Sequence, residues 1–154
     1  MMPKRLTLTG VIAALTLLVP GTPALAEQSQ SFERHVVHYN TLITAQLPAE
    51  VARAHDIQRS SSRALLNIAV LEKPEDEADM PSAVTAEVTA SAVNRAGQRR
   101  NISMREVTEQ DAIYYIGTFR VHDEENLDFT VRITPSHSEA APYELRFEQE
   151  FFVD

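Results

Sequence analysis

The residues of this sequence best suited to chemistry are its five histidines, since imidazole is a common metal ligand and a general base near neutral pH. His35 and His38 are the closest pair. Three residues apart, they would share one face of a helix but lie on opposite faces of a strand. The neighbouring Val36, Val37 and Tyr39 favour a strand. The pair therefore predicts ordinary half-exposed histidines and no shared metal site.

Other metal chemistries have no better support. A copper(I) carrier would combine histidine with soft thioether ligands. Beyond residue 26 the methionines are Met80, in an acidic stretch, and Met104, on an alternating segment that favours the core. Residues 72–79 are rich in acids but lack the D-x-D-x-D-G spacing of a calcium loop. We expect a solvated loop there, no resident metal and no cofactor; whether this loop binds cations weakly stays open.

Catalytic frameworks are equally absent from the sequence. The chain has no cysteine, which excludes thiol chemistry and disulfides. The serines at residues 60–62 lack the G-x-S-x-G context of an activated nucleophile. Only Gly97 and Gly117 follow residue 26, too few for a phosphate-binding loop. We predict no catalytic residue and no enzyme activity.

Three residues are weak candidates for contact with a partner. Asn67 interrupts an otherwise apolar strand, and a buried amide without hydrogen bonds costs about 1–3 kcal/mol. A structural hydrogen bond to a neighbouring loop is the simpler explanation of Asn67. Tyr114 and Phe152 are expected to project from the outer faces of their strands, where aromatic side chains anchor protein partners.

The elements that must position these residues are strands. Apolar and polar side chains alternate with period two over residues 84–92, 127–133 and 143–153. This alternation is typical of strands with one buried and one solvated face. Residues 64–71 are apolar on both faces apart from Asn67, which predicts a central strand that is covered on both sides.

Weaker segments complete the architecture. Residues 113–121, residues 100–107 and parts of residues 32–47 bring the count to about seven or eight strands. Residues 94–98 carry the turn chemistry of a hairpin, and residues 48–55 predict one or two helical turns. We therefore expect an all-β, immunoglobulin-like antiparallel sandwich with one short helical connector.

The N-terminus has the composition of a secretory signal peptide. Lys4 and Arg5 precede an apolar stretch over residues 6–19. Ala24 and Ala26 then supply the small residues that signal peptidase accepts. The stretch is shorter than the roughly 20 residues of a membrane-spanning helix, so a cleaved signal is favoured over an anchor.

The expected organisation is a signal peptide at residues 1–26 and a single β-sandwich domain at residues 27–154, with cleavage between Ala26 and Glu27. The product would be periplasmic or secreted. Loss of two basic residues with the signal would leave 12 basic against 22 acidic residues, a formal net charge of −10. Such a surface repels phosphate backbones and anionic lipids, which disfavours nucleic acid and membrane partners.

Three segments carry a family resemblance: residues 63–70, residues 111–116 and residues 147–154. Together they resemble a bacterial exported family known as domain of unknown function 4426. The resemblance covers essentially the whole chain after the signal. It implies an exported β-rich domain and brings no activity or site residue with it.

These observations predict an exported, non-catalytic binding or protein-interaction module with an unknown protein partner in the periplasm. A small-molecule or metal carrier is the alternative, and a hydrolase is less favoured. Residues 143–153 are the expected docking strand, because the charges on their outer face are typical of a protected edge strand. Tyr114 and Phe152 are the candidate aromatic anchors of that partner.

Overall fold

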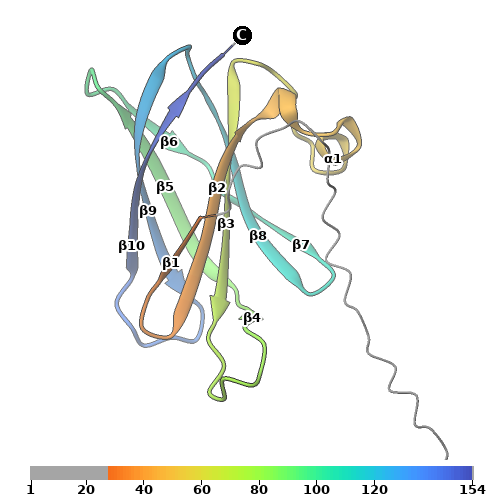
Figure 1. Cartoon of the computed structure of the whole chain (residues 1–154), viewed down its shortest axis with the longest axis vertical. Coiled ribbons are helices and arrows are strands. Elements are labelled where there is room, and N and C mark those ends of the chain that lie inside the picture. Colours follow the sequence, from red (N-terminus) through yellow and green to blue (C-terminus); the bar gives the residue numbers. More distant parts are fainter. Residues whose placement is uncertain (1–27, 154) are drawn as a thin grey trace, which may run out of the picture.

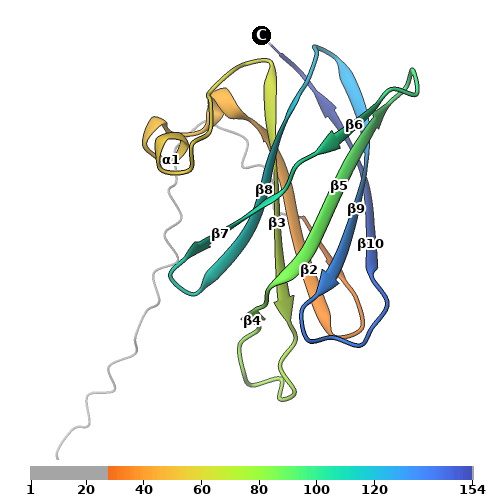
Figure 2. The same ribbon diagram turned by 180° about the vertical axis from the view of Figure 1, so that it is seen from behind.

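The computed structural model describes residues 28–153. The predicted signal peptide and its cleavage point lie outside this described part. Within it, two antiparallel sheets pack face to face (Figures 1 and 2), which confirms the predicted all-β sandwich. No helix of residues 28–153 is long and apolar enough to cross a membrane.

The larger sheet has six strands in the order β1-β2-β3-β8-β7, with β4 paired to β3 beside this path. All of its pairings are antiparallel. Its strands are β1 (Gln28–Ser31), β2 (His35–Ile43), β3 (Arg63–Glu72), β4 (Ser82–Ala83), β7 (Arg105–Glu109) and β8 (Ala112–Arg120).

The smaller sheet has four strands in the order β10-β9-β5-β6, again antiparallel. The strands are β5 (Ala86–Asn94), β6 (Arg99–Ile102), β9 (Glu125–Pro135) and β10 (Tyr143–Phe151). β5 and β6 are joined by the predicted hairpin, where Gly97 takes a positive φ of 79°. The two-residue alternation of β9 and β10 is confirmed, because their apolar positions face the core.

The main core fills the space between the sheets. Phe129 of β9 stacks on Phe147 of β10 with ring centroids 4.7 Å apart, and its edge meets Phe119 of β8 at 5.4 Å. From β3, Leu66 and Ile68 are fully buried in the same core. Burial of these large side chains stabilises the sandwich without any disulfide.

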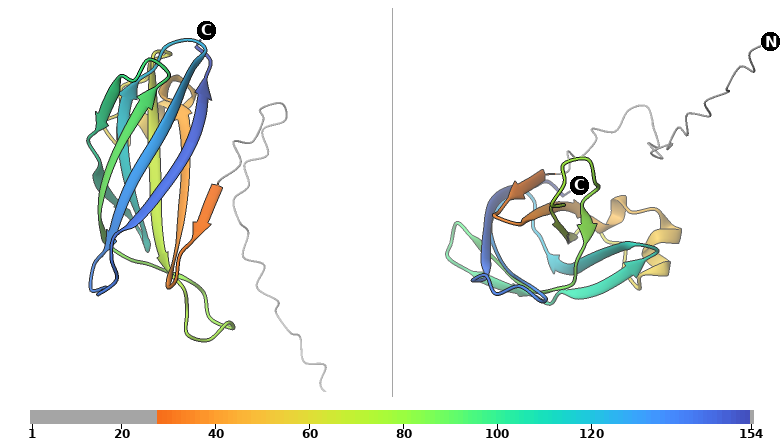
Figure 3. Two further views of the ribbon diagram at one scale, coloured as in Figure 1. Left: turned by 90° about the vertical axis from the view of Figure 1, so that its left-hand side faces the viewer. Right: turned by 90° about the horizontal axis from the view of Figure 1, so that it is seen from below.

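A second, smaller apolar cluster lies on the outer face of the six-stranded sheet. A 3-10 turn, η1 (Thr44–Gln46), and a short helix, α1 (Ala49–Ala54), cover Leu65 of β3 and Ile116 of β8 there. Seen from below, α1 lies on the side of this sheet away from the four-stranded sheet (Figure 3). The prediction that β3 is covered on both faces is confirmed, and the helical connector supplies part of the outer cover.

The prediction of a single strand over residues 100–107 is wrong. The chain leaves the smaller sheet after β6 and enters the larger one as β7. This division and the short strands β1 and β4 bring the described residues to ten strands. This crossing passes directly against Gly117 of β8: a Cβ there would lie 2.7 Å from Ile102, Ser103 and Met104 atoms. Met104 packs against the main core, as expected.

Arg100 and Glu125 form the best-buried ion pair of the described residues. Two guanidinium nitrogens of Arg100 each lie 2.6 Å from a carboxylate oxygen of Glu125, and these side chains are 19% and 9% exposed. The Arg100 hydrogen bonds lower the pKa of Glu125 from its ordinary value of 4.5, against the opposing effect of burial. The pair ties β6 to the start of β9.

We expect Gly117→Ala to lower the free energy of unfolding by about 1–3 kcal/mol, because the new methyl group would overlap a backbone carbonyl as well as two side chains. Urea denaturation followed by circular dichroism measures the change. Gly97→Asn is the control, since Gly97 has open space around it and asparagine tolerates its positive φ. An unchanged Gly117→Ala midpoint would contradict the close packing.

We expect Glu125→Gln to cost about 1–3 kcal/mol of stability at pH 7. Because the folded-state pKa of Glu125 is lowered, the wild-type advantage is fully present above pH 4.5 and is lost as the pH falls through that lowered pKa. Urea denaturation at several pH values measures the convergence. Glu144→Gln, which disrupts an exposed pair with Arg146, should change stability by less than about 1 kcal/mol at every pH.

Candidate functional site

The second apolar cluster does not fill the space beneath α1, and a pocket of about 210 Å³ remains. Its floor is the outer face of β2, β3 and β8, where Leu42, Leu65 and Ile116 contribute aliphatic side chains. Val107 of the edge strand β7 and Val51 of α1 form parts of its sides. Val51 is 41% exposed, so it marks the rim of the pocket.

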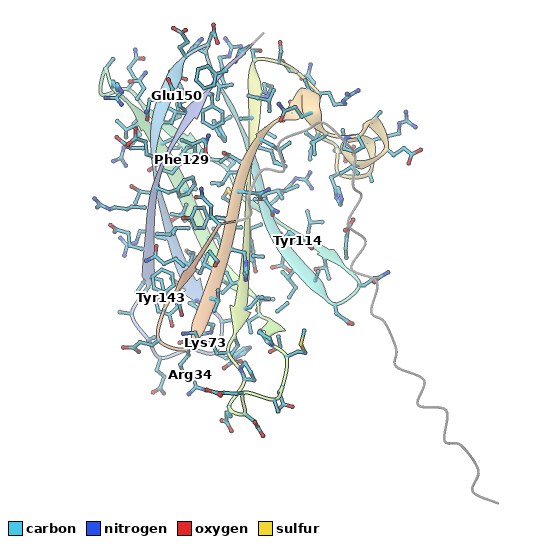
Figure 4. All side chains as sticks on the ribbon, in the orientation of Figure 1. Arg34, Lys73, Tyr114, Phe129, Tyr143 and Glu150 are labelled. Atoms are coloured by element: carbon cyan, nitrogen blue, oxygen red, sulfur yellow. The ribbon has the colours of Figure 1, made fainter. Side chains whose placement is uncertain are left out.

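Two of the three predicted partner-binding residues, Asn67 and Tyr114, meet in this pocket. Asn67 lies opposite Ile116 in the β3–β8 register, and Tyr114 lies opposite Val107 in the β7–β8 register. Figure 4 labels Tyr114 beside the hairpin of β7 and β8. The register of three neighbouring strands therefore brings together residues that are far apart in the sequence.

Asn67 is the polar anomaly of this pocket. Its Oδ1 atom is buried and has no hydrogen-bond partner among residues 28–153. The structural hydrogen bond that the sequence suggested for this amide is therefore missing at Oδ1. Unpaired buried acceptors are uncommon in folded proteins, and each one costs stability unless a donor reaches it.

Polar contacts fix one side of the pocket. His55, directly after α1, places its Nε2 atom 2.9 Å from a carboxylate oxygen of Glu109 on β7. The guanidinium of Arg105 donates to the backbone carbonyl of His55. Both contacts join the end of α1 to β7, so they attach this helix to the edge of the larger sheet.

The third candidate, Phe152, lies apart from this pocket. It follows β10, is 64% exposed and does not line the pocket. β10 pairs only with β9, so it is an edge strand of the smaller sheet, as the charge pattern indicated. Phe152 and β10 therefore form a separate exposed surface.

A larger polar hollow of about 850 Å³ lies at the end of the sandwich where Arg34, Lys73 and Tyr143 gather in Figure 4. His35 lines it but is buried rather than half-exposed, and its Nδ1 atom shares a 2.9 Å hydrogen bond with the Tyr143 hydroxyl. Burial lowers the pKa of His35, against the opposing effect of Glu72.

His35 and His38 point to opposite faces of β2, as predicted from their spacing. Across residues 28–153, no three histidine, aspartate or glutamate side chains are grouped so that they could hold a metal ion. The polar hollow therefore contains no such group of metal-ligating side chains, and the apolar pocket is the stronger candidate site.

Sequence reasoning named Asn67 and Tyr114 but missed the aliphatic residues around them. The signal that could have found these residues is a break in alternation. Ile43 follows Leu42 and Ile116 follows Tyr115, so β2 and β8 each carry apolar side chains on both faces. Together with the two-sided β3, this pattern marks an outer apolar patch across three strands.

A search of curated proteins gives no match, but solved structures share this fold. FetP of a uropathogenic Escherichia coli strain is 10% identical, with a TM-score of 0.60 over 83% of this chain and 95% of that chain. A copper-bound variant of FetP is 11% identical, with a TM-score of 0.59 over 83% and 96% of the two chains. At these identities the likeness concerns the fold.

A nearer likeness is to a DUF4426 family protein of Pseudomonas aeruginosa. Its crystal structure is 30% identical, with a TM-score of 0.70 over 83% of this chain and 96% of that chain. The model of the family described as domain of unknown function (DUF4426) matches residues 29–154. This agrees with the resemblance seen in the sequence, and the chain belongs to the DUF4426 family.

Proposed function

We propose that this protein is an exported, non-catalytic binding module whose pocket beneath α1 receives an apolar side chain of a protein partner. The observation that carries the proposal is the pocket itself: an apolar hollow on the outer face of a sheet, with Tyr114 and Asn67 among its lining residues. Aromatic residues in such hollows are typical anchors of protein interfaces.

The size of the pocket favours a side chain over a complete small molecule. Sites for small ligands and cofactors usually enclose about 300–1,000 Å³. The pocket here measures about 210 Å³, which is below that range. An anchor residue that projects from a larger partner fits such a volume, and the rest of the partner would lie on the surface around it.

The neighbouring edge strand offers that surface. β7 is the last strand of its sheet, and Val107 at its middle lines the pocket. An extended segment can add to an exposed edge through main-chain hydrogen bonds while a side chain enters an adjacent pocket. The arrangement supports a partner that lies along β7 with one residue beneath α1.

Export is supported by the signal-like composition of the N-terminus. The FetP crystal structure came from protein expressed recombinantly in the periplasm of Escherichia coli, which accords with a periplasmic setting for this fold. The metal-carrier alternative rests on the copper-bound FetP variant. Stoichiometric copper or zinc in protein purified without a histidine tag would favour that alternative over the binding module.

The test fills the pocket from its rim. Val51→Phe should weaken capture of a partner by at least tenfold in crosslinking pull-downs from periplasmic extract, because the new ring would occupy the anchor's space. Tyr114→Ala should weaken capture as well. Ala49→Phe is the matched control, since Ala49 is exposed on α1 and does not line the pocket.

Thermal denaturation confirms that each variant is folded before capture is compared. A partner that Val51→Phe retains at wild-type strength would show that this pocket is not the docking site. Loss of capture in Phe152→Ala alone would instead place the partner on the β10 surface.

A further inference from the structure

Strand β7 leaves one edge of the larger sheet open. Among residues 28–153 it pairs with β8 alone, and Figures 1 and 2 show the hairpin of these two strands at the outer margin of the sandwich. Four of the five β7 residues are exposed, and Val107 in the middle is half-buried. Such a strand presents main-chain N–H and C=O groups on which another strand can add.

The two ends of β7 carry opposite charges on one face. Arg105 begins the strand and Glu109 ends it, each two residues from Val107, so these three side chains lie on the same face. A second copy of β7 can run antiparallel beside the first with the two Val107 residues opposite each other. Arg105 of each copy then lies opposite Glu109 of the other, and opposite charges that face each other across antiparallel strands stabilise the pairing.

The main chain of β7 fits the same register. Along an antiparallel strand, residues whose N–H and C=O groups bond to one neighbour alternate with residues whose groups point to the other side. In the register centred on Val107, Arg105 meets Glu109 and Glu106 meets Thr108 of the other copy. Each pair joins two residues that point the same way in this alternation. The outward groups of one copy therefore meet the outward groups of the other.

The other sheet edges lack this charge symmetry. β1 has no charged side chain, and β6 carries two arginines and no acid. Self-pairing about the middle of β10 would place Arg146 opposite Glu148 but also Glu144 opposite Glu150. Like charges directly opposite each other destabilise a pair of strands. The mixed charges of β7 are thus matched by a second copy of β7 itself.

The contacts of Arg105 and Glu109 within the chain leave both groups available. One oxygen of the Glu109 carboxylate lies 2.9 Å from His55 Nε2, and the side chain is still 59% exposed. The Arg105 guanidinium donates to the His55 carbonyl, and its remaining N–H donors can reach a carboxylate across the strand pair.

We propose that two copies of this chain associate through β7, antiparallel and centred on Val107, and so join their larger sheets into one. A five-residue strand gives a small interface, typical of weak and reversible association. A second copy and another protein cannot occupy the same edge, so the dimer withholds β7 from the partner proposed above. The association itself does not depend on that partner.

Sedimentation velocity of the exported chain over a range of concentrations tests the association. We expect a reversible monomer–dimer equilibrium for the wild type. Arg105→Glu and Glu109→Arg each place like charges opposite each other at two positions of the register, and each should weaken association at least tenfold. Arg99→Glu on β6 and Glu150→Arg on β10 are the matched controls, because they change the net charge equally at exposed sites on other edges.

A mixture of Arg105→Glu with Glu109→Arg separates pairing between copies from effects within one copy. Each variant has lost one of its contacts with His55, and mixing does not restore that contact. One copy then carries two acids and the other two arginines, so the register predicts mixed dimers with an affinity near that of the wild type. Circular dichroism confirms beforehand that both variants are folded.

A single introduced cysteine tests the centre of the register. The chain has no cysteine of its own, so any disulfide must join two introduced thiols. Directly opposite residues of antiparallel strands have Cα atoms about 4.5–5.5 Å apart, within the range of a disulfide. In a glutathione redox buffer, Val107→Cys should form covalent dimers, whereas Glu109→Cys should form at least tenfold fewer because residue 109 does not face its own copy.

The outcomes decide this proposal without reference to the pocket beneath α1. A wild type that stays monomeric at millimolar concentration would overturn the β7 dimer. Association that the two charge reversals leave unchanged, or that the control variants weaken equally, would overturn this register. Failure of the mixture to associate, or equal crosslinking at residues 107 and 109, would do the same. None of these results involves another protein, so the proposed binding module is tested separately by the Val51→Phe capture experiment.

Discussion

Strand β3 carries apolar side chains on both of its faces, and such a strand is stable only when both are covered. The four-stranded sheet covers the inner face completely, so Leu66 and Ile68 have no exposed surface. The outer face has above it only a three-residue turn, a six-residue helix and loop residues such as Leu47 and Ile57. These cover Leu65 but leave a hollow beside Asn67, and the candidate site exists because this second cover is small.

Local patterns in the sequence predicted much of the fold. Alternation located β5, β9 and β10, and Asn94 with Gly97 marked the hairpin after β5, because these signals depend on neighbours along the chain. The split of residues 100–107 was not predictable in this way. Alternation continues through the crossing, and the choice of sheet depends on distant partners such as Gly117.

The candidate site was likewise predictable only in part from the sequence. Asn67 stood out because a polar residue breaks an apolar strand, and Tyr114 because it occupies the outer face of β8. Their meeting depends on strand register, which residue types alone do not reveal. The burial of His35 was likewise hidden, since its partner Tyr143 is 108 residues away in the sequence.

The two apolar clusters have separate side chains and share only the backbone of the larger sheet. The segment over residues 44–62 packs on the outer cluster and contributes nothing to the core between the sheets. Changes in this segment would therefore alter the outer cover of β3 while leaving the core between the sheets intact, as changes in the recognition loops of antibodies leave their framework intact. A sandwich core that is separate from its outer cover gives this fold a route to new specificities.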